Sequence, residues 1–139
     1  MNKQKNIRWK QRFANFEKAY LSLVKSYEAW SDDPDNDFIQ DSLIQRYEYS
    51  LELAWKTMKD YLENEGFIDV TSPKKAVRKA FQERMVQDGA AWIVALDDRN
   101  KTSHAYDENM AKEVIQSITE QHIPIFRDFY LTMKKIYDE

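Results

Sequence analysis

The 139-residue sequence contains no cysteine, only two glycines and three prolines, and no long apolar run. Without cysteine the chain forms no disulfide and offers no thiolate to a metal ion. So few glycines and prolines leave little of the turn chemistry that an all-β fold requires. The longest apolar run, residues 90–96, is far shorter than the ~20 residues that cross a bilayer, and the first residues, MNKQKNIRWKQRF, contain no apolar signal-peptide region. We therefore expect a cytoplasmic protein that does not associate with membranes.

The residues that are present favour a single helical domain spanning residues 1–139. Charged residues make up 32% and hydrophobic residues 42% of the chain, a balance typical of amphipathic helices, and aromatic residues reach 14%. The formal net charge of −3 argues against a protein that coats nucleic acid nonspecifically. It leaves room for a small local basic site.

Apolar residues recur at helical spacing over most of the chain. A first helix is expected before the loop sequence SDDPDND, and a second over residues 37–65, closed by Gly66. The inward stripe of the first helix consists of Trp9, Phe13, Phe16, Tyr20, Leu23, Tyr27 and Trp30.

Capping residues predict where the remaining helices begin. Ser72 followed by Pro73 indicates the start of a third helix, and Asp88-Gly89 precedes a short apolar helix over about residues 90–98. The last helix is expected to start after Asp107 and to be kinked near Pro124, because proline cannot donate the helical hydrogen bond. These elements predict an all-α fold, an up-and-down antiparallel four-helix bundle with a broken, short extra helix.

The segment RNKTSHAYDE, residues 99–108, places Arg99, His104 and Tyr106 close together in the sequence. On an uninterrupted helix Arg99 and His104 would point roughly 140° apart, so they converge only if the helix ends between them. One interpretation is structural: Arg99 pairs with Asp97 or Asp98, and the other two side chains pack between helices. The other is a phosphate site in which Arg99 neutralises charge and His104 transfers a proton.

Several polar residues are candidates for supporting such a site. Glu48, Glu52 and Lys56 follow one another at four-residue steps, which suits either a surface salt-bridge ladder or the wall of a polar pocket. The pocket residues expected around the motif are Glu48, Glu52, Asp98, Asn100 and Ser103.

Two further groups of residues have a structural and a functional interpretation. The cations Lys74, Lys75, Arg78 and Lys79 form either a solvated face or an electrostatic lip for RNA. His122 falls in register with the apolar stripe of the last helix, so we expect a buried histidine with a hydrogen-bond partner rather than a catalytic one.

A metal site built by the protein would need a different pattern of ligands. Neither histidine follows a glutamate by three positions, and the two do not share helical spacing. We expect no metal site and no cofactor.

Two segments resemble a known family. IQRYEYSLELAWKTMKDYLENEGF, residues 44–67, looks like the central helix of the nucleotidyltransferase substrate-binding proteins of the HEPN (higher eukaryote and prokaryote nucleotide-binding) superfamily. WIVALDDRNKTSHAYDE, residues 92–108, contains the R-x4-H motif of that superfamily and its extended R-x4-H-x-Y form. The order of the other helices fits as well, so the resemblance covers nearly the whole chain.

The resemblance implies a homodimeric four-helix bundle that works with a minimal nucleotidyltransferase encoded beside it. Many HEPN proteins are metal-independent ribonuclease toxins, and in the R-x4-H-x-Y subgroup the partner silences the nuclease by transferring AMP to the motif tyrosine. Carried onto this sequence, Arg99 and His104 would be catalytic and Tyr106 the AMP acceptor. The family's older description implies instead a non-catalytic subunit that binds a nucleotide or substrate for the nucleotidyltransferase.

Overall fold

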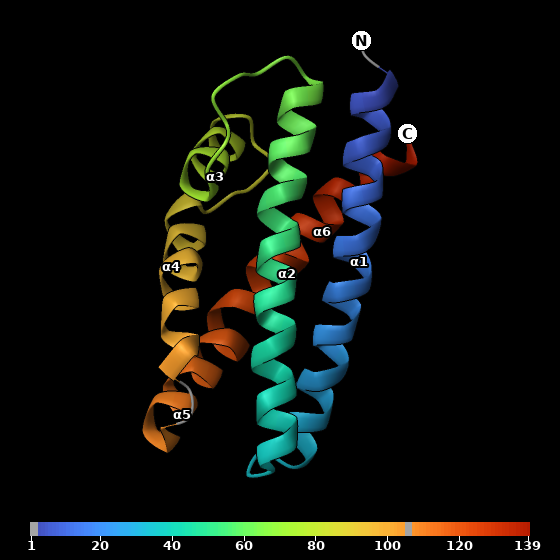
Figure 1. The fold of residues 1–139 in the computed structure, drawn as a ribbon. Helices are drawn as coiled ribbons and strands as arrows, with labels where there is room; N and C mark the ends of the chain where they lie inside the picture. The colour runs from blue at the N-terminus through green and yellow to red at the C-terminus, as the bar shows by residue number, and fades with distance from the viewer. Residues whose placement is uncertain (1–2, 105–106) are drawn as a thin grey trace.

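The computed structural model describes residues 3–104 and 107–139, and within them it is helical with no β-strand. The prediction of an all-α bundle is confirmed. Figure 1 shows the order of the helices along the chain. The elements are α1 (Lys3–Asp32), α2 (Asp37–Asn64), α3 (Pro73–Gln82), α4 (Gly89–Arg99), the 3₁₀ helix η1 (Asn100–His104), α5 (Glu108–Ser117), the π-helical turn η2 (Ile118–His122) and α6 (Ile123–Asp138).

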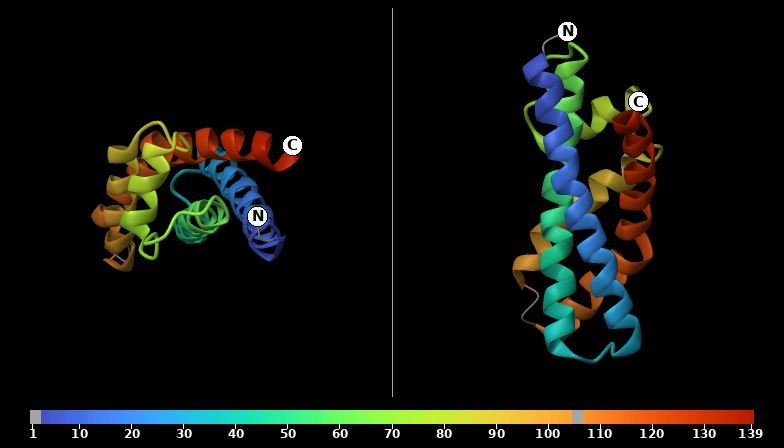
Figure 2. Two further views of the ribbon diagram at one scale, coloured as in Figure 1. Left: turned by 90° about the horizontal axis from the view of Figure 1, so that it is seen from above. Right: turned by 90° about the vertical axis from the view of Figure 1, so that its right-hand side faces the viewer.

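The two longest helices, α1 and α2, form an antiparallel hairpin that runs the length of the molecule (Figure 1). The hairpin turns in the predicted loop, where the side chain of Asn36 accepts hydrogen bonds from the backbone N–H groups of Phe38 and Ile39. Viewed from above, α3 and α4 lie on the side of α2 away from α1, and α6 lies across the hairpin (Figure 2). The pocket described below lies on this α3–α4 side of α2.

Aromatic side chains fill the core between these layers. The first five residues of the α1 stripe, from Trp9 to Leu23, are all buried, whereas Tyr27 is 36% exposed and Trp30 is only partly buried. Phe126 of α6 packs within about 6.5 Å, between ring centroids, of Phe16 on α1, Tyr47 on α2 and Trp92 on α4. One ring therefore joins four helices, and the core is continuous across the bundle.

The predicted caps begin and end the helices as local chemistry requires. Ser72, Asp88 and Asp107 each accept a hydrogen bond from a backbone N–H in the first turn of α3, α4 and α5. Gly66 follows α2 with φ of +95°, a left-handed conformation that favours glycine.

The last helix departs from the simple kink that was predicted near Pro124. The structure divides it into α5, the π-helical turn η2 and α6, so that the backbone N–H of Ile123 bonds to the carbonyl of Ile118, five residues earlier. Such turns insert one extra residue into a helix and redirect its side chains. Here the turn ends at His122, which it places in the core.

Candidate functional site

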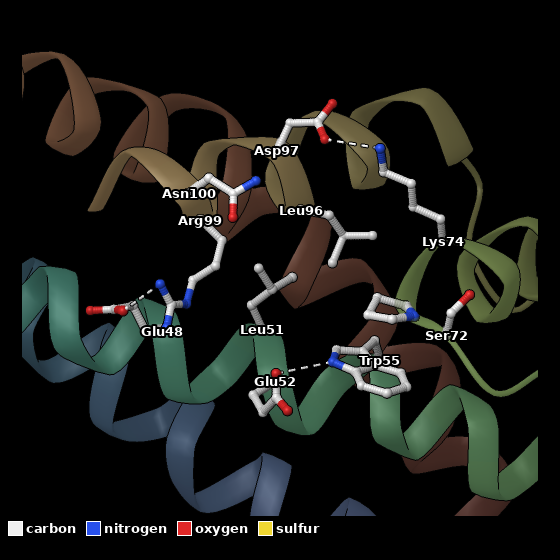
Figure 3. Close-up of a pocket in the computed structure, with 11 residues that line it drawn as sticks. Glu48, Leu51, Glu52, Trp55, Ser72, Lys74, Leu96, Asp97, Arg99 and Asn100 are labelled. Atoms are coloured by element: carbon white, nitrogen blue, oxygen red, sulfur yellow. Dashed lines mark hydrogen bonds and ion pairs between the residues drawn. The ribbon is translucent and has the colours of Figure 1, made fainter. Parts of the chain in front are cut away.

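A pocket of about 410 Å³ opens between α2, the start of α3 and the end of α4 (Figure 3). Arg99 and Glu48 lie at one end of it, Trp55 and Lys74 at the other, and Leu51 between them. A second hollow of about 350 Å³ shares Glu48 and Arg99 with it. The residues that line the larger pocket are Glu48, Leu51, Glu52, Trp55, Ser72, Pro73, Lys74, Leu96, Asp97, Arg99 and Asn100.

Arg99 is the last residue of α4, and its guanidinium is held at one nitrogen. Nη1 lies 2.9 Å from Oε2 of Glu48 on α2 and donates to Oγ1 of Thr102 at 3.1 Å. The Thr102 hydroxyl in turn donates to the carbonyl of Arg99 at 2.7 Å. Among the described residues none bonds Nε or Nη2, and the side chain is 47% exposed. The guanidinium is thus oriented by the protein and accessible to an anion.

The two aspartates that precede Arg99 have other partners. Asp97 lines the pocket and lies 3.2 Å from Nζ of Lys74. Asp98 is buried and lies 2.7 Å from Nε2 of His122. The expected pairing of Arg99 with one of them is therefore wrong, because Arg99 pairs with Glu48 instead. Asp98 was also expected to line the pocket, but it points into the core, because consecutive residues of a helix face about 100° apart.

His122 is the buried histidine with a partner that its register predicts. It is 1% exposed, and its ring stacks on Tyr47 of α2 at 5.3 Å between centroids. Since a carboxylate only accepts, Nε2 carries the proton that is donated to Asp98. Nδ1 is buried and has no partner among the described residues. Burial lowers the pKa of His122, and the hydrogen bond to Asp98 opposes this effect only in part.

Tyr47 connects the same group of residues to the backbone of α4. Its hydroxyl donates to the carbonyl of Ala95 at 2.6 Å, and burial raises its pKa. Three elements, α2, α4 and η2, are therefore joined by Tyr47, Asp98 and His122. The contact of α4 with η2 is made by Asp98, the residue directly before Arg99. This arrangement fixes the end of α4 from the core side.

Glu52 belongs both to the predicted ladder and to the pocket wall. Its carboxylate lies 3.0 Å from Nζ of Lys56 and accepts from Nε1 of Trp55 at 3.1 Å. Partial burial raises the pKa of Glu52, but the hydrogen bonds from Trp55 and Lys56 outweigh it, so that the net shift is downward. The carboxylate is therefore ionised at neutral pH.

The 3₁₀ helix η1 carries the rest of the motif. Asn100 lines the pocket, whereas Ser103 is exposed and its hydroxyl donates to the carbonyl of Asn100 at 3.0 Å. The helix ends between Arg99 and His104 as the motif requires, since α4 stops at Arg99 and η1 follows. The side chain of His104 and all of Tyr106 lie outside the described residues.

Sequence reasoning missed part of the pocket. Trp55 was not among the expected site residues; it packs against the core and also forms part of the pocket wall. Of the four cations expected near the third helix, Lys74 alone lines this pocket, while Lys75 pairs with Asp69. The signal for Lys74 was its place directly after the Ser72-Pro73 cap, which faces α2.

Residues 3–104 and 107–139 lack two further features. They contain no group of three His, Cys, Asp or Glu side chains arranged to hold a metal ion. No helix among them is long and apolar enough to span a membrane.

The fold and the site define a helical bundle with an oriented arginine at the edge of a pocket large enough for a small ligand. Residues 11–135 match a family model described as "Nucleotidyltransferase substrate binding protein like". The match covers most of the sequence. The chain belongs to this family, as its two characteristic segments predicted.

Known proteins from two bacteria are similar to this chain. A Haemophilus influenzae protein named "Probable ribonuclease HepT" is 31% identical over an alignment of 112 residues, and the match covers 72% of this chain and 77% of that protein. A solved Haemophilus influenzae structure, described as revealing the fold of a substrate-binding domain of a nucleotidyltransferase, matches with a TM-score of 0.77 and 26% identity over 88% of this chain and 98% of its own. A crystal structure of a Thermus thermophilus protein matches with a TM-score of 0.71 and 28% identity over 89% of this chain and 99% of its own.

Proposed function

We propose that this protein is a metal-independent endoribonuclease toxin, paired in the cytoplasm with a minimal nucleotidyltransferase, and that Arg99 and His104 are its catalytic residues. The observation that carries the proposal is the position of Arg99, which ends α4, lines the pocket and keeps two guanidinium edges free of described partners. Similarity to a protein named as a probable ribonuclease supports it.

The chemistry follows from the two side chains. His104 accepts the proton of a ribose 2′-hydroxyl, and the 2′-oxygen bonds to the adjacent phosphorus while the bond from phosphorus to the 5′-oxygen breaks. The leaving 5′-oxygen takes up a proton from water, so the products are a 2′,3′-cyclic phosphate and a 5′-hydroxyl. Arg99 stabilises the charge that develops on the phosphoryl oxygens.

Cleavage of RNA in the presence of EDTA tests this mechanism. We expect the wild-type protein to release fragments that end in a cyclic phosphate. Arg99→Ala should lower kcat/KM by roughly 10²–10³-fold and His104→Ala by roughly 10²–10⁴-fold. Arg127→Ala on α6 is the matched control, because Arg127 is exposed and does not line this pocket. Equal cleavage by the wild type and His104→Ala would show that the observed RNA cleavage does not come from the site formed by Arg99 and His104.

Tyr106 is the proposed point of regulation. Its hydroxyl would attack the α-phosphorus of ATP bound to the partner nucleotidyltransferase, with loss of its proton and release of pyrophosphate. The phosphodiester added to Tyr106 carries a negative charge into the motif, where it competes for Arg99. Intact-mass spectrometry of the co-expressed pair should detect AMP on the wild type and none on Tyr106→Phe. Undiminished AMP on the Phe variant would remove this role from Tyr106.

A non-catalytic subunit is the second candidate function. The family description and the pocket between α2, α3 and α4 favour it, because both point to binding of a nucleotide or substrate. Nucleotide or RNA binding without cleavage, in the assay above, would select this function. Under either function we propose a single domain over residues 1–139 that forms a homodimer. The residues that we propose to support the site are Glu48, Glu52, Asp98, Asn100 and Ser103. Of these, Asp98 acts from the core by holding the end of α4.

A further inference from the structure

Trp55 differs from the other three tryptophans in its surroundings. Trp9 and Trp92 are buried and pack against other rings, and Trp30 contacts Tyr27. No aromatic ring of the described residues contacts Trp55, which is partly buried and lines the pocket that contains Arg99. One side of the indole packs against the core, and the side that borders the pocket can meet a planar group that enters it.

The orientation of the Trp55 ring is set by its own helix. Nε1 donates to Glu52, one turn earlier on α2, and Glu52 is held in turn by Lys56. The polar edge of the indole is thus satisfied before any ligand arrives, and the carbon face forms the wall next to Leu51 and Leu96 (Figure 3). A ligand loses little entropy in ordering a side chain that is already placed.

The charged residues of the pocket limit how many phosphates a ligand can carry on the planar ring that packs against Trp55. Arg99 lies at one end and Lys74 at the other, and each pairs with a carboxylate, Glu48 at 2.9 Å and Asp97 at 3.2 Å. All four side chains are partly exposed, so these pairs are weak enough for a phosphate to displace one of them. With Glu52 the pocket holds three carboxylates against two cations, which disfavours a polyphosphate. One phosphate on an apolar ring fits this balance best.

We propose that the pocket is a nucleotide subsite in which Trp55 stacks a nucleobase at one end while Arg99 holds a single phosphate at the other. The ligand class is a single-stranded RNA nucleotide or a nucleoside monophosphate, and the ring lies between Trp55 and Leu96. The inference rests on the proposed function, which supplies the phosphate at Arg99. Stacking of a base on an aromatic side chain contributes roughly 1–3 kcal/mol and tolerates any base, so the subsite recognises single-stranded RNA with little sequence preference.

The test is binding of a fluorescently labelled, single-stranded 2′-O-methyl RNA, which lacks the 2′-hydroxyl and cannot be cut. Trp55→Leu should raise Kd by roughly 5- to 150-fold, the loss of one stacked base. Trp55→Phe keeps a ring and should bind within a few-fold of the wild type. Trp30→Leu is the control, because Trp30 lies near the α1–α2 loop, outside this pocket. Circular dichroism of each variant checks that the bundle is folded.

A second readout leaves the pocket undisturbed. In Trp30→Phe, nucleoside monophosphate should quench the fluorescence of Trp55, whereas ribose 5-phosphate, which has no base, should not. Trp30→Phe/Trp55→Phe should lose the quenching. Equal quenching by ribose 5-phosphate would overturn the stacking.

Other outcomes separate this inference from the proposed function. If Trp55→Leu is folded and binds RNA as the wild type does while the wild type cleaves RNA, the subsite is wrong and the nuclease stands. If the wild type binds through Trp55 but never cleaves, the nuclease is wrong and the subsite stands. A fall in molar mass by light scattering for Trp55→Leu would show that a second copy of this chain covers the pocket, and it would also overturn the subsite.

Discussion

Four acidic residues, Glu48, Glu52, Asp97 and Asp98, lie around Arg99, and the structure joins it to the one that is most distant in sequence. Glu48 lies on another helix and is 2.9 Å from Nη1, whereas Asp97 and Asp98 next to Arg99 bond elsewhere. The pair is partly exposed, with 47% of the Arg99 side chain and 29% of the Glu48 side chain accessible. Glu48 therefore competes with any phosphate for the same guanidinium.

Glu48→Gln tests this competition at the scale of a single residue. Removing the carboxylate frees Arg99 of an exposed ion pair worth about 0.2–1 kcal/mol, so Kd for 2′-O-methyl RNA should fall by roughly 1.5- to 5-fold at low salt. The gain should shrink at high salt because the ion pair is screened. Glu28→Gln, an exposed change on α1, should leave Kd unchanged. Weaker binding by Glu48→Gln would mean that Glu48 contacts the ligand or holds Arg99 in its binding position.

At the scale of elements, the end of α4 is attached to the core through Asp98. The carboxylate accepts a hydrogen bond from Nε2–H of His122, the last residue of the π-helical turn, and the hydroxyl of Tyr47 on α2 donates to the carbonyl of Ala95 on α4. The adjacent Asp97 bonds to Lys74 at the surface. Replacing each of the two neighbouring aspartates therefore compares the loss of a buried interaction, at Asp98, with the loss of an exposed one, at Asp97.

Asp98→Ala should lower the free energy of unfolding by about 1–3 kcal/mol, because it leaves the buried Nε2–H of His122 without an acceptor. Asp97→Ala breaks only an exposed ion pair and should change the free energy of unfolding by less than about 1 kcal/mol. Urea denaturation followed by circular dichroism measures both. Similar losses for the two variants would show that the bond between His122 and Asp98 does not stabilise the bundle.

The lowered pKa of His122 predicts a pH dependence of stability. Its pKa in the folded protein lies below the ordinary value of 6.5, so the unfolded chain binds the proton more readily. Stability should therefore fall as the pH drops through and below 6.5, and be restored above it. His122→Gln keeps a donor for Asp98 but cannot titrate, so its free energy of unfolding should vary less between about pH 5.5 and 7.5. Because His104 is present in both proteins, the difference between them reports on His122 alone. An equal change of the free energy of unfolding with pH in both proteins would show that His122 does not cause the pH dependence.

At the scale of the whole molecule, the aromatic core connects α1, α2, α4 and α6 through Phe126. A single continuous core should unfold in one cooperative transition. Circular dichroism and tryptophan fluorescence should therefore give coincident urea curves. For a homodimer whose assembly is coupled to folding, the midpoint should also rise with protein concentration. Two separate transitions would contradict the single domain, and a concentration-independent midpoint together with a monomeric mass would contradict the homodimer.

Local patterns were sufficient for the helices and for the motif. Spacing of apolar residues placed the α1 stripe from Trp9 to Leu23 in the core, and Ser72, Asp88 and Asp107 marked where helices begin. These features depend on residues within one or two turns, which is why they can be read along the chain. The register of His122 with the core stripe is of the same kind.

The partners of the charged residues and the shape of the pocket required the packing of whole helices. Asp97, Asp98 and Arg99 point about 100° apart on α4, so the rotation of that helix against α2 and η2 sends them to Lys74, His122 and Glu48 in turn. The packing of α2 against α3 and α4 also places Trp55 in the wall of this pocket, at the end opposite Arg99. Spacing along a single chain carries no information on the rotation of one helix against another, because that angle is set by how the side chains of several helices interlock in the core.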